Sequence, residues 1–311
     1  MASQHPKVPR RQVDGVLLLD KPVGWTSNDA LIKAKRLLLA KKAGHTGTLD
    51  PFATGLLPLC FGEATKFAQD LLDADKTYET VVHLGITTDT GDTEGQAIDT
   101  REVNVTREQI EAVLAQFRGP IDQVPPMYSA LKRDGKALYE YAREGIVLER
   151  EARRVTIHSL EFISYDAPLL KLAVTCSKGT YIRVLGEDIG KALGCGAHLN
   201  ALRRTRVGAL TIAHAVTLEQ LTGADEAGRA ALLAPADSLL STFPAVHLPE
   251  AVAKRFLHGQ RIALEREGVA APCHEGRVRV YAEGQSALLG TGNVLGGALL
   301  APERLIATAQ L

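Results

Sequence analysis

The segment GHTGTLDPFATG, residues 44–55, places a single carboxylate among residues that shape a loop. Asp50 stands directly before Pro51, and a proline moves the preceding residue out of the helical region into an extended conformation. Glycine adds backbone freedom and lets a ligand approach closely. The glycines are Gly44, Gly47 and Gly55. The segment predicts a fixed loop that presents Asp50 for nucleophilic or electrostatic chemistry on a bulky substrate. An isolated Asp-Pro pair is more often a simple turn, so the rest of the chain must decide.

Strands and helices are expected to alternate around this loop. Alternating or continuous apolar runs with β-branched residues predict strands at 15–20, 77–85, 155–163 and 169–176. Period-3.6 patterns predict helices at 30–42, 106–117 and 181–193, the first preceded by Thr26 and Asp29 in capping-box spacing. The elements lack the strict spacing of strand–helix–strand units, which favours an α+β fold.

Two segments depart from this pattern. Residues 119–154 begin with prolines and then interleave aromatic and basic side chains, which indicates a protruding insertion. An αα-hairpin with a charged exterior is the alternative. A composition change near 223–250 predicts a helix and then a domain boundary, followed by a β-rich module of about 60 residues.

Composition excludes several classes of protein. With 45% hydrophobic and 23% charged residues, the chain can bury a core and keep a soluble surface. No apolar run approaches the roughly 18 residues that a membrane span needs, and the N-terminus lacks an apolar signal segment. The four cysteines form no Cys-x-x-Cys pair and no zinc-spaced cluster, so we expect reduced thiols, no metal site and a cytoplasmic protein. The phosphate-loop and dinucleotide fingerprints are also missing from the sequence.

The 36 basic and 36 acidic residues cancel, yet they are segregated along the chain. Residues 1–50 carry nine Lys or Arg against four Asp or Glu, whereas residues 89–102 are acidic. Segregated charge can form a basic groove at zero net charge. Ordinary solvated faces would give the same counts, so the counts alone leave both interpretations open.

Five blocks in the same order resemble the signature of the TruB-type tRNA pseudouridine synthase family. The resemblance covers about residues 12–245 and is weaker beyond. The blocks are LDKPVGWTS (19–27), GHTGTLDPFATGLLP (44–58), KTY (76–78), PPMYSALK (125–132) and CSKGTYIR (176–183).

The resemblance implies a pseudouridine-synthase fold: a central, mostly antiparallel mixed sheet flanked by helices, an RNA-clamping insertion and a small β-rich PUA-like module. The implied domains are a flexible basic tail (1–11), a catalytic domain (12–248) with its insertion at about 120–154, and a C-terminal RNA-binding module (249–311).

The implied activity is isomerisation of uridine 55 in the T loop of tRNA to pseudouridine, after the base is flipped out of the RNA. The bond from ribose to N1 of uracil breaks, and carbon 5 bonds to the same ribose carbon. No redox step occurs and no group is lost, so no cofactor is expected. Glycosidases usually need two carboxylates, but a uracil anion delocalises its own charge and returns, so one is enough. Whether that carboxylate forms a sugar ester or gives a glycal stays open.

The resemblance also assigns roles to single residues. Asp50 would act on the sugar, and Arg183 would keep it ionised and aim it. Tyr78 would stack on the target base and is a hypothetical acceptor for the carbon 5 proton, although a phenol of pKa ~10 is a poor base at neutral pH. The expected RNA-binding residues are His45, which inserts into the RNA loop; Tyr181 and Leu202, which line the base pocket; Lys21 and Lys66, which contact phosphate or support the loop; and Lys132 and Arg143 of the clamp.

The expected partner is the T arm of tRNA, with no obligatory protein partner, and the protein is expected to be a monomer. One alternative is a guide-dependent relative acting on ribosomal RNA, which the short, lysine-poor C-terminus disfavours. Another is a tRNA-folding chaperone that needs no chemistry. A glycosidase for free nucleosides is disfavoured by the large RNA-facing insertion.

Overall fold

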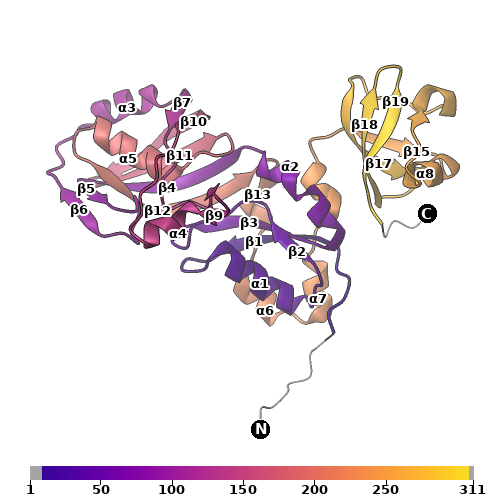
Figure 1. The fold of residues 1–311 in the computed structure, drawn as a ribbon, viewed down its shortest axis with the longest axis horizontal. Coiled ribbons are helices and arrows are strands. Elements are labelled where there is room, and N and C mark those ends of the chain that lie inside the picture. The colour runs from indigo at the N-terminus through magenta and orange to yellow at the C-terminus, as the bar shows by residue number, and fades with distance from the viewer. Residues whose placement is uncertain (1–8, 308–311) are drawn as a thin grey trace, which may run out of the picture.

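The computed structural model describes residues 9–307 (Figure 1). Residues 1–8, most of the expected tail, lie outside the described residues. Arg11 pairs with Ala40 in an isolated parallel bridge and forms an ion pair with Glu226. The chain is therefore attached to the body of the molecule from Arg11 onward.

A ten-stranded mixed sheet forms the centre of the larger part of the molecule. Its strands run in the order β14-β1-β3-β12-β4-β11-β10-β7, with β2 paired to β3 and β13 to β12. Among the described residues, the β1–β14 and β3–β12 pairs are parallel and the other pairs of this sheet are antiparallel. The expected mostly antiparallel mixed sheet is thus confirmed. Its strands are β1 (Gly15–Lys21), β2 (Ala43–His45), β3 (Thr54–Phe61), β4 (Lys76–Leu84), β7 (Gly119–Gln123), β10 (Arg153–Asp166), β11 (Leu169–Cys176), β12 (Ala197–Val207), β13 (Leu210–Thr211) and β14 (Val216–Thr217).

The helices pack on this sheet in two groups (Figure 1). In one group, α1 packs against β2 and β3, and α6 packs beside α1 against β14 and β1; in the other, α5 and α3 cover β12 and β10. Two short hairpins, β5–β6 (Ile86–Thr88 with Ala97–Thr100) and β8–β9 (Lys132–Arg133 with Lys136–Ala137), stand apart from the sheet. The helices of this part are α1 (Ser27–Leu37), α2 (Ala68–Leu72), α3 (Arg107–Gln116), α4 (Leu138–Arg143), α5 (Ile182–Ala192), α6 (Leu218–Gly223) and α7 (Glu226–Ala231), with 3₁₀ turns at Gly62–Phe67, Ile212–His214 and Ala236–Leu240.

Helix α1 begins at its expected cap and ends earlier than its sequence pattern suggests. The Thr26 hydroxyl accepts a hydrogen bond from the Asp29 backbone N–H at 3.0 Å. The helix was expected through residue 42 but ends at Leu37, and Leu39 adopts a positive φ of 55°. The chain turns there because residues 43–45 pair with β3, so sheet pairing overrides the helical periodicity of the lysines and leucines.

The C-terminal module has its own sheet and its own apolar core. Its strand order is β15-β17-β18-β19-β16, and Val246, Phe256, Val280 and Leu300 are among its buried residues. The expected β-rich module is confirmed, while its RNA-binding role stays a prediction. Its elements are β15 (Ala245–Leu248), α8 (Glu250–Leu257), β16 (Ile262–Ala263), a 3₁₀ turn (Leu264–Glu267), β17 (Gly276–Ala282), β18 (Leu288–Leu295) and β19 (Leu299–Leu305).

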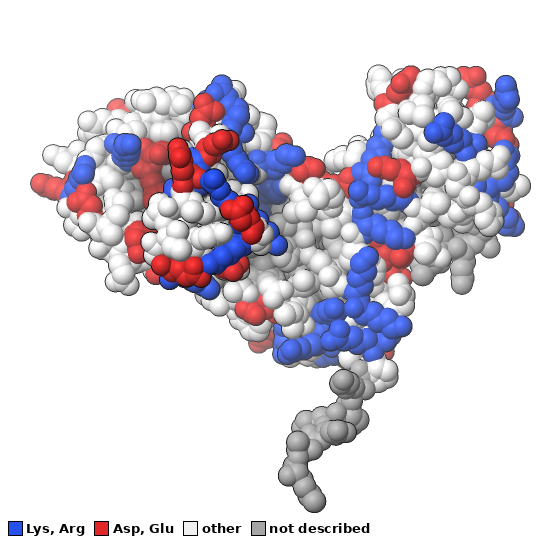
Figure 2. All heavy atoms as spheres, viewed as in Figure 1, with Lys and Arg blue, Asp and Glu red and all other residues white. Residues whose placement is uncertain are grey.

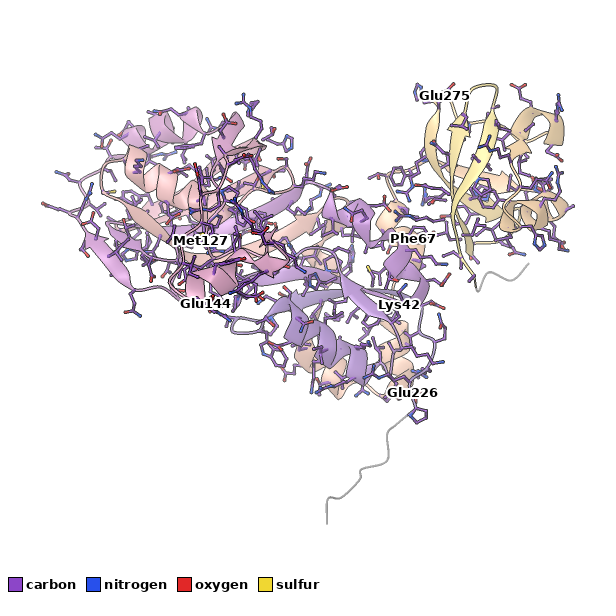
Figure 3. The ribbon with its side chains drawn as sticks, viewed as in Figure 1. Lys42, Phe67, Met127, Glu144, Glu226 and Glu275 are labelled. Carbon is purple, nitrogen blue, oxygen red and sulfur yellow. The ribbon has the colours of Figure 1, made fainter. Side chains whose placement is uncertain are left out.

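A polar and apolar interface attaches this module to the larger part. Phe67, which lies on the side toward the module in Figure 3, belongs to the same buried cluster as Tyr281 and Leu288. The Tyr281 hydroxyl donates to a carboxylate oxygen of Asp237 at 2.7 Å, and Arg277 forms an ion pair with Asp70. The module is therefore docked against the larger part by specific contacts.

The expected insertion is smaller than its predicted bounds. Residues 119–123 form edge strand β7, which pairs with β10, and β10 begins at Arg153. Between them lie the β8–β9 hairpin and the single short helix α4, so the αα-hairpin alternative is wrong. In Figure 3, Met127 and Glu144 mark this segment. In the described part of the chain, no helix combines the length and apolar character needed to cross a membrane.

Candidate active site

The loop that carries Asp50 connects β2 to β3 and is fastened on both sides. The Ser27 hydroxyl accepts from the Leu49 N–H at 2.8 Å and donates to the Leu49 carbonyl at 3.0 Å. On the other side, the Pro51 carbonyl accepts from the Gly24 N–H at 2.8 Å. Asp50 is thus held between two anchored neighbours, which agrees with the expected fixed loop.

Only two of the three glycines in the motif need to be glycine. Gly47 and Gly55 have φ of 110° and 102°, a region that side chains disfavour. A Cβ at Gly55 would also stand 2.3 Å from the Arg204 carbonyl oxygen. Gly44, in contrast, has no positive φ and nothing within 4 Å of a Cβ position, so the folded protein itself does not require glycine there, and its expected role in ligand approach stays a prediction.

Asp50 and Arg183 meet in this structure. The Arg183 Nε lies 3.0 Å from Asp50 Oδ2, and the Arg183 side chain is 5% exposed. Arg183 also donates to the Thr90 carbonyl at 2.9 Å and to the Tyr128 carbonyl at 2.6 Å. It sits in the first turn of α5, buried against the sheet, so the alternative of a surface helix residue does not hold. The guanidinium joins the loop, the 90–94 segment and the start of the insertion.

Sequence reasoning missed a second carboxylate in this cluster. Asp92 is 4% exposed at its side chain, and its Oδ2 lies 3.5 Å from Arg183 Nη1. The other carboxylate oxygen accepts from the Thr90 hydroxyl at 2.6 Å and from the Glu94 N–H at 3.0 Å. The available signal was the acidic stretch 89–102, whose carboxylates gave no indication of which one would be buried.

Two opposing effects act on the pKa of Asp50. Burial of the site raises the pKa of Asp50 above its ordinary value of 3.8, and the Arg183 guanidinium opposes this rise. The Asp50 side chain still keeps 36% of its surface exposed, facing outward for a substrate. Arg183 therefore holds the Asp50 carboxylate in one orientation and favours its ionised form.

Tyr78, Leu202 and Arg204 lie on the paired strands β4 and β12. Leu202 pairs with Thr80, and Arg204 pairs with Tyr78, across the antiparallel strands β12 and β4. Burial raises the pKa of the Tyr78 phenol, while the neighbouring Arg204 guanidinium opposes the rise. A raised pKa keeps the phenol protonated at neutral pH, which argues against the expected proton-acceptor role.

The chain was compared with family models, with curated proteins and with solved structures. A model of the TruB family pseudouridylate synthase N-terminal domain matches residues 35–182, and a model of the tRNA pseudouridylate synthase B C-terminal domain matches 183–241. A further model, pseudouridine synthase II TruB, C-terminal, matches 244–306. The tRNA pseudouridine synthase B of Burkholderia lata is 65% identical over 308 residues, which is 99% of this chain and 95% of that protein.

The chain belongs to the TruB family of pseudouridylate synthases.

A further TruB-family relative, the tRNA pseudouridine synthase B of Ralstonia nicotianae, is 63% identical over 98% of both chains. Two solved structures share the fold. An H/ACA RNP bound to a substrate RNA containing 2′-deoxyuridine matches at a TM-score of 0.72 and 26% identity, over 94% of this chain and 84% of that one. A Cbf5-Nop10-Gar1 complex matches at 0.72 and 27%, over 98% and 91%.

In this TruB-family chain, Tyr181 is fixed through its backbone by a glutamine that sequence reasoning missed. The buried Gln123 amide donates to the Tyr181 carbonyl at 3.3 Å and accepts from the Tyr181 N–H at 3.1 Å. Because Gln123 ends β7, this pair ties the edge of the sheet to the start of α5. Burial raises the pKa of the Tyr181 phenol, which stays neutral.

His45 lies at the end of β2, opposite Leu59 of β3, and is half-buried. Its Nδ1 is buried and has no hydrogen-bond partner among the described residues. Burial, reinforced by Arg204, lowers the pKa of the His45 imidazole below its ordinary 6.5. A neutral ring at the mouth of the loop is compatible with the expected stacking role.

The two lysines expected to contact phosphate are used within the protein. Lys21 is 0% exposed, and its ammonium donates to the carbonyls of Pro22, Trp25 and Pro51 at 3.0, 2.7 and 3.3 Å. Burial lowers the pKa of Lys21 to about 8. Lys21 therefore supports the Asp50 loop, which was the second of its two expected roles. Lys66 is likewise engaged, donating to Glu63 and to the Leu305 carbonyl of the C-terminal module, each at 2.7 Å.

Lys132 and Arg143 are exposed on β8 and α4. The Arg143 guanidinium lies over the Tyr139 ring, 5.3 Å from its centroid. Figure 2 shows further Lys and Arg side chains gathered over the region of α1 and β2, where Lys41 and Lys42 are exposed. The described residues contain no group of three or more His, Cys, Asp or Glu arranged to hold a metal ion.

Proposed function

We propose that this chain converts uridine 55 in the T loop of tRNA to pseudouridine, with Asp50 as the residue that acts on the ribose. The observation that carries the proposal is the contact between Asp50 and the buried Arg183 at 3.0 Å, on the loop that belongs to the TruB signature. The names of relatives that are 61–65% identical over nearly their whole length support the tRNA substrate.

The chemistry follows from one aimed carboxylate. The bond between the ribose carbon and N1 breaks, and its electron pair leaves on the uracil. Asp50 either bonds to the sugar carbon or removes a neighbouring ribose proton. The base then turns and carbon 5 bonds to the sugar carbon, which either displaces Asp50 from that carbon or is followed by return of the ribose proton that Asp50 removed. The carbon 5 proton then leaves to solvent, and N1 takes up a proton from solvent. Atoms and charge balance without a cofactor, because the product is an isomer of the substrate.

The target base must leave its stack to reach Asp50, at an unstacking cost of a few kcal/mol. We assign His45 to the vacated space in the RNA loop, and Tyr78, Tyr181 and Leu202 to the flipped base. Residues from 12 to 244 would form the catalytic domain. The module that binds another part of the tRNA would begin with β15 at Ala245, a few residues before the boundary expected between 248 and 249, because β15 pairs with β17 of the C-terminal sheet. We further propose that the enzyme works in the cytoplasm as a monomer without a guide RNA or protein partner.

The decisive assay mixes the purified protein with unmodified tRNA transcript alone and maps pseudouridine at single-nucleotide resolution. We expect complete conversion at position 55 and none in a transcript whose uridine 55 is replaced by cytidine. Conversion that requires an added guide RNA would favour the guide-dependent alternative. Tight binding and refolding of the transcript without any conversion would favour the chaperone alternative.

The insertion is proposed to clamp RNA phosphates through Lys132 and Arg143. Each phosphate contact contributes about one unit to the slope of log affinity against log salt concentration. Arg143→Ala is therefore expected to reduce that slope by about one, and Lys132→Ala with Arg143→Ala by about two. The measurement is the dissociation constant for unmodified tRNA between about 50 and 300 mM salt.

Arg107→Ala is the matched control. Arg107 is also an exposed arginine over an aromatic ring, 4.7 Å from the Phe162 centroid, but it belongs to α3. Its removal should leave the slope unchanged. A slope that stays constant in the Lys132 and Arg143 variants would reject the clamp and leave the isomerase proposal intact.

A further inference from the structure

Trp25 is an exposed aromatic side chain in the short turn between β1 and α1. The chain has one tryptophan, seven tyrosines and seven phenylalanines, and all of them lie in the described residues. Only Trp25, at 36%, and Tyr139, at 37%, are exposed. The Arg143 guanidinium lies over the Tyr139 ring, whereas among residues 9–307 no Lys or Arg lies over the Trp25 ring. Exposed tryptophan is typical of binding surfaces, where one large rigid ring supplies much of the contact.

The turn that carries Trp25 is fastened directly to the Asp50 loop. The buried Lys21 ammonium donates to the Trp25 carbonyl at 2.7 Å and to the Pro51 carbonyl at 3.3 Å. The Gly24 N–H donates to the same Pro51 carbonyl at 2.8 Å, and Gly24 has a φ of 80°, which favours glycine. Trp25 therefore lies beside the Asp50 loop on backbone that is already fixed, so a ligand bound there has little backbone to order.

His45 and Trp25 belong to segments on opposite edges of β3. Strand β1, which leads into the Trp25 turn, pairs with β3 from Gly55 onward. Strand β2, which ends at His45, must therefore occupy the other edge of β3. The β3 partners of Lys21 and His45 are Gly55 and Leu59, which are about 13 Å apart along a strand, and two strand spacings add about 10 Å across it. One flat base cannot contact both rings, so the two residues serve different nucleotides.

A purely structural role for Trp25 is the alternative. Trp25 directly precedes Thr26, the N-cap of α1, and an apolar residue at this position often packs on the fourth helical residue, here the buried Ala30. Such packing helps to fix the turn, but it does not account for the ring surface that stays exposed.

RNA is the occupant that the surroundings favour. Lys and Arg side chains gather over α1 and β2, on either side of the Asp50 loop, and their charge complements phosphate (Figure 2). The target ribose must lie at Asp50, so the neighbouring nucleotides pass over the adjoining turn. Every base has an aromatic face, and extruding one base deprives its neighbours of a stacking partner.

We propose that Trp25 stacks on a nucleobase adjacent to the target uridine, on the side of the Asp50 loop away from His45. The tryptophan ring replaces part of the stacking that this base loses when the uridine is flipped out. Trp25 is thus a binding residue that holds the opened RNA loop and takes no part in the chemistry. The inference rests on the proposed function, because the target ribose at Asp50 determines where the adjacent bases lie.

The fluorescence of Trp25 tests this contact directly, because a protein with a single tryptophan reports on that side chain alone. Asp50→Asn protein, with wild type in parallel, is titrated with T-arm RNA, and saturation is established separately from the anisotropy of labelled RNA. We expect the emission to be quenched at saturation and the ring to be protected from acrylamide. An abasic ribose directly before or directly after position 55 should abolish both effects in one of the two RNAs. Unchanged emission and acrylamide access with intact RNA, or quenching that persists with both abasic RNAs, would overturn the proposal.

Substitution of Trp25 separates stacking from a structural role. Trp25→Leu keeps an apolar side chain for packing on α1 but has no ring, so T-arm affinity should fall about 5- to 150-fold, the scale for one stacked base. Trp25→Phe keeps a ring and should recover most of the affinity. With the abasic RNA that lacks the partner base, Trp25→Leu should bind as well as wild type. A structural role predicts equal losses with intact and abasic RNA, which would reject stacking.

Ile98→Ala is the matched control for removing an exposed apolar side chain. Ile98 is 65% exposed on β6, next to the Asp99 carboxylate, and its loss should leave RNA affinity unchanged. If Trp25→Leu fails to fold, the fluorescence of the unsubstituted Trp25 decides alone. Quenching of Trp25 by an RNA that wild type leaves unconverted would reject the proposed function alone. Conversion of uridine 55 with unchanged Trp25 emission would reject the stacking role alone.

Discussion

Asp50→Asn is expected to stop pseudouridine formation while tRNA affinity stays within about twofold of wild type. The amide keeps the shape of the carboxylate but can neither attack the sugar carbon nor remove a ribose proton. Loss of a residue that carries the chemistry lowers the turnover rate by about 10⁴-fold or more. The measurement is single-turnover conversion of unmodified tRNA, with affinity from filter binding or fluorescence anisotropy at fixed salt.

The fold should survive this change, because the loop is held through Ser27, Gly24 and Lys21 rather than through the Asp50 side chain. Asp166→Asn serves as the control, since Asp166 is an exposed aspartate at the far end of β10 and should retain full turnover. Residual activity above about one-hundredth of wild type in Asp50→Asn would transfer the main role to another group.

Arg183→Met is expected to lower turnover about 10³-fold and to move the acid limb of the pH–rate profile upward. Activity needs the ionised carboxylate, so it falls as pH drops through the pKa of Asp50. That pKa is already raised by burial and is held down by Arg183, so removing the guanidinium raises it further. The measurement is the single-turnover rate between about pH 5 and 9, with tRNA affinity determined at each pH.

The same variant should be less stable. Asp92 and Arg183 are 4% and 5% exposed at their side chains, and removing one partner of a buried pair costs about 3–5 kcal/mol of unfolding free energy. The difference should shrink toward low pH, because the raised pKa of Asp50, the other carboxylate paired with Arg183, lets protonation remove its uncompensated charge. Arg101→Met is the matched control: its pair with Asp99 is 59% and 45% exposed, so stability should change by less than about 1 kcal/mol. An acid limb that does not move would show that Arg183 does not control the ionisation of Asp50.

Local patterns in the sequence were reliable where the conformation depends on a few neighbouring residues. The buried run at 15–20 became β1, and the 77–85 and 169–176 segments became β4 and β11. The Thr26 cap started α1, because its hydroxyl and the Asp29 N–H are only three residues apart. The end of α1 could not be predicted in the same way, since it depends on the pairing of residues 43–45 with β3.

The residues of the candidate site also fall into two groups: those that could be predicted from neighbouring residues and those that could not. The Asp50 motif and its fixed loop were readable in the sequence, and the link to Arg183 came from family resemblance rather than from spacing. Asp92, Gln123 and Arg204 carried no such signal, because a charged or amide side chain far from the motif is usually solvated. The order of the strands brings Arg204 to the site. Strand β12 lies between β3 and β4, so Arg204 lies beside both the Asp50 loop and the strand that carries Tyr78.

By itself, the sequence determined the α+β class, the family signature and the carboxylate that can do chemistry, since each depends on residues close together in the chain. The tertiary structure alone decided which charges are buried and which partners they meet. It buried Lys21, it directed Lys66 to the Leu305 carbonyl of the C-terminal module, and it left Arg204 without a carboxylate partner among the described residues. The physical reason is that burial of a charge depends on contacts between strands and loops that are far apart in sequence, and those contacts exist only once the sheet has assembled.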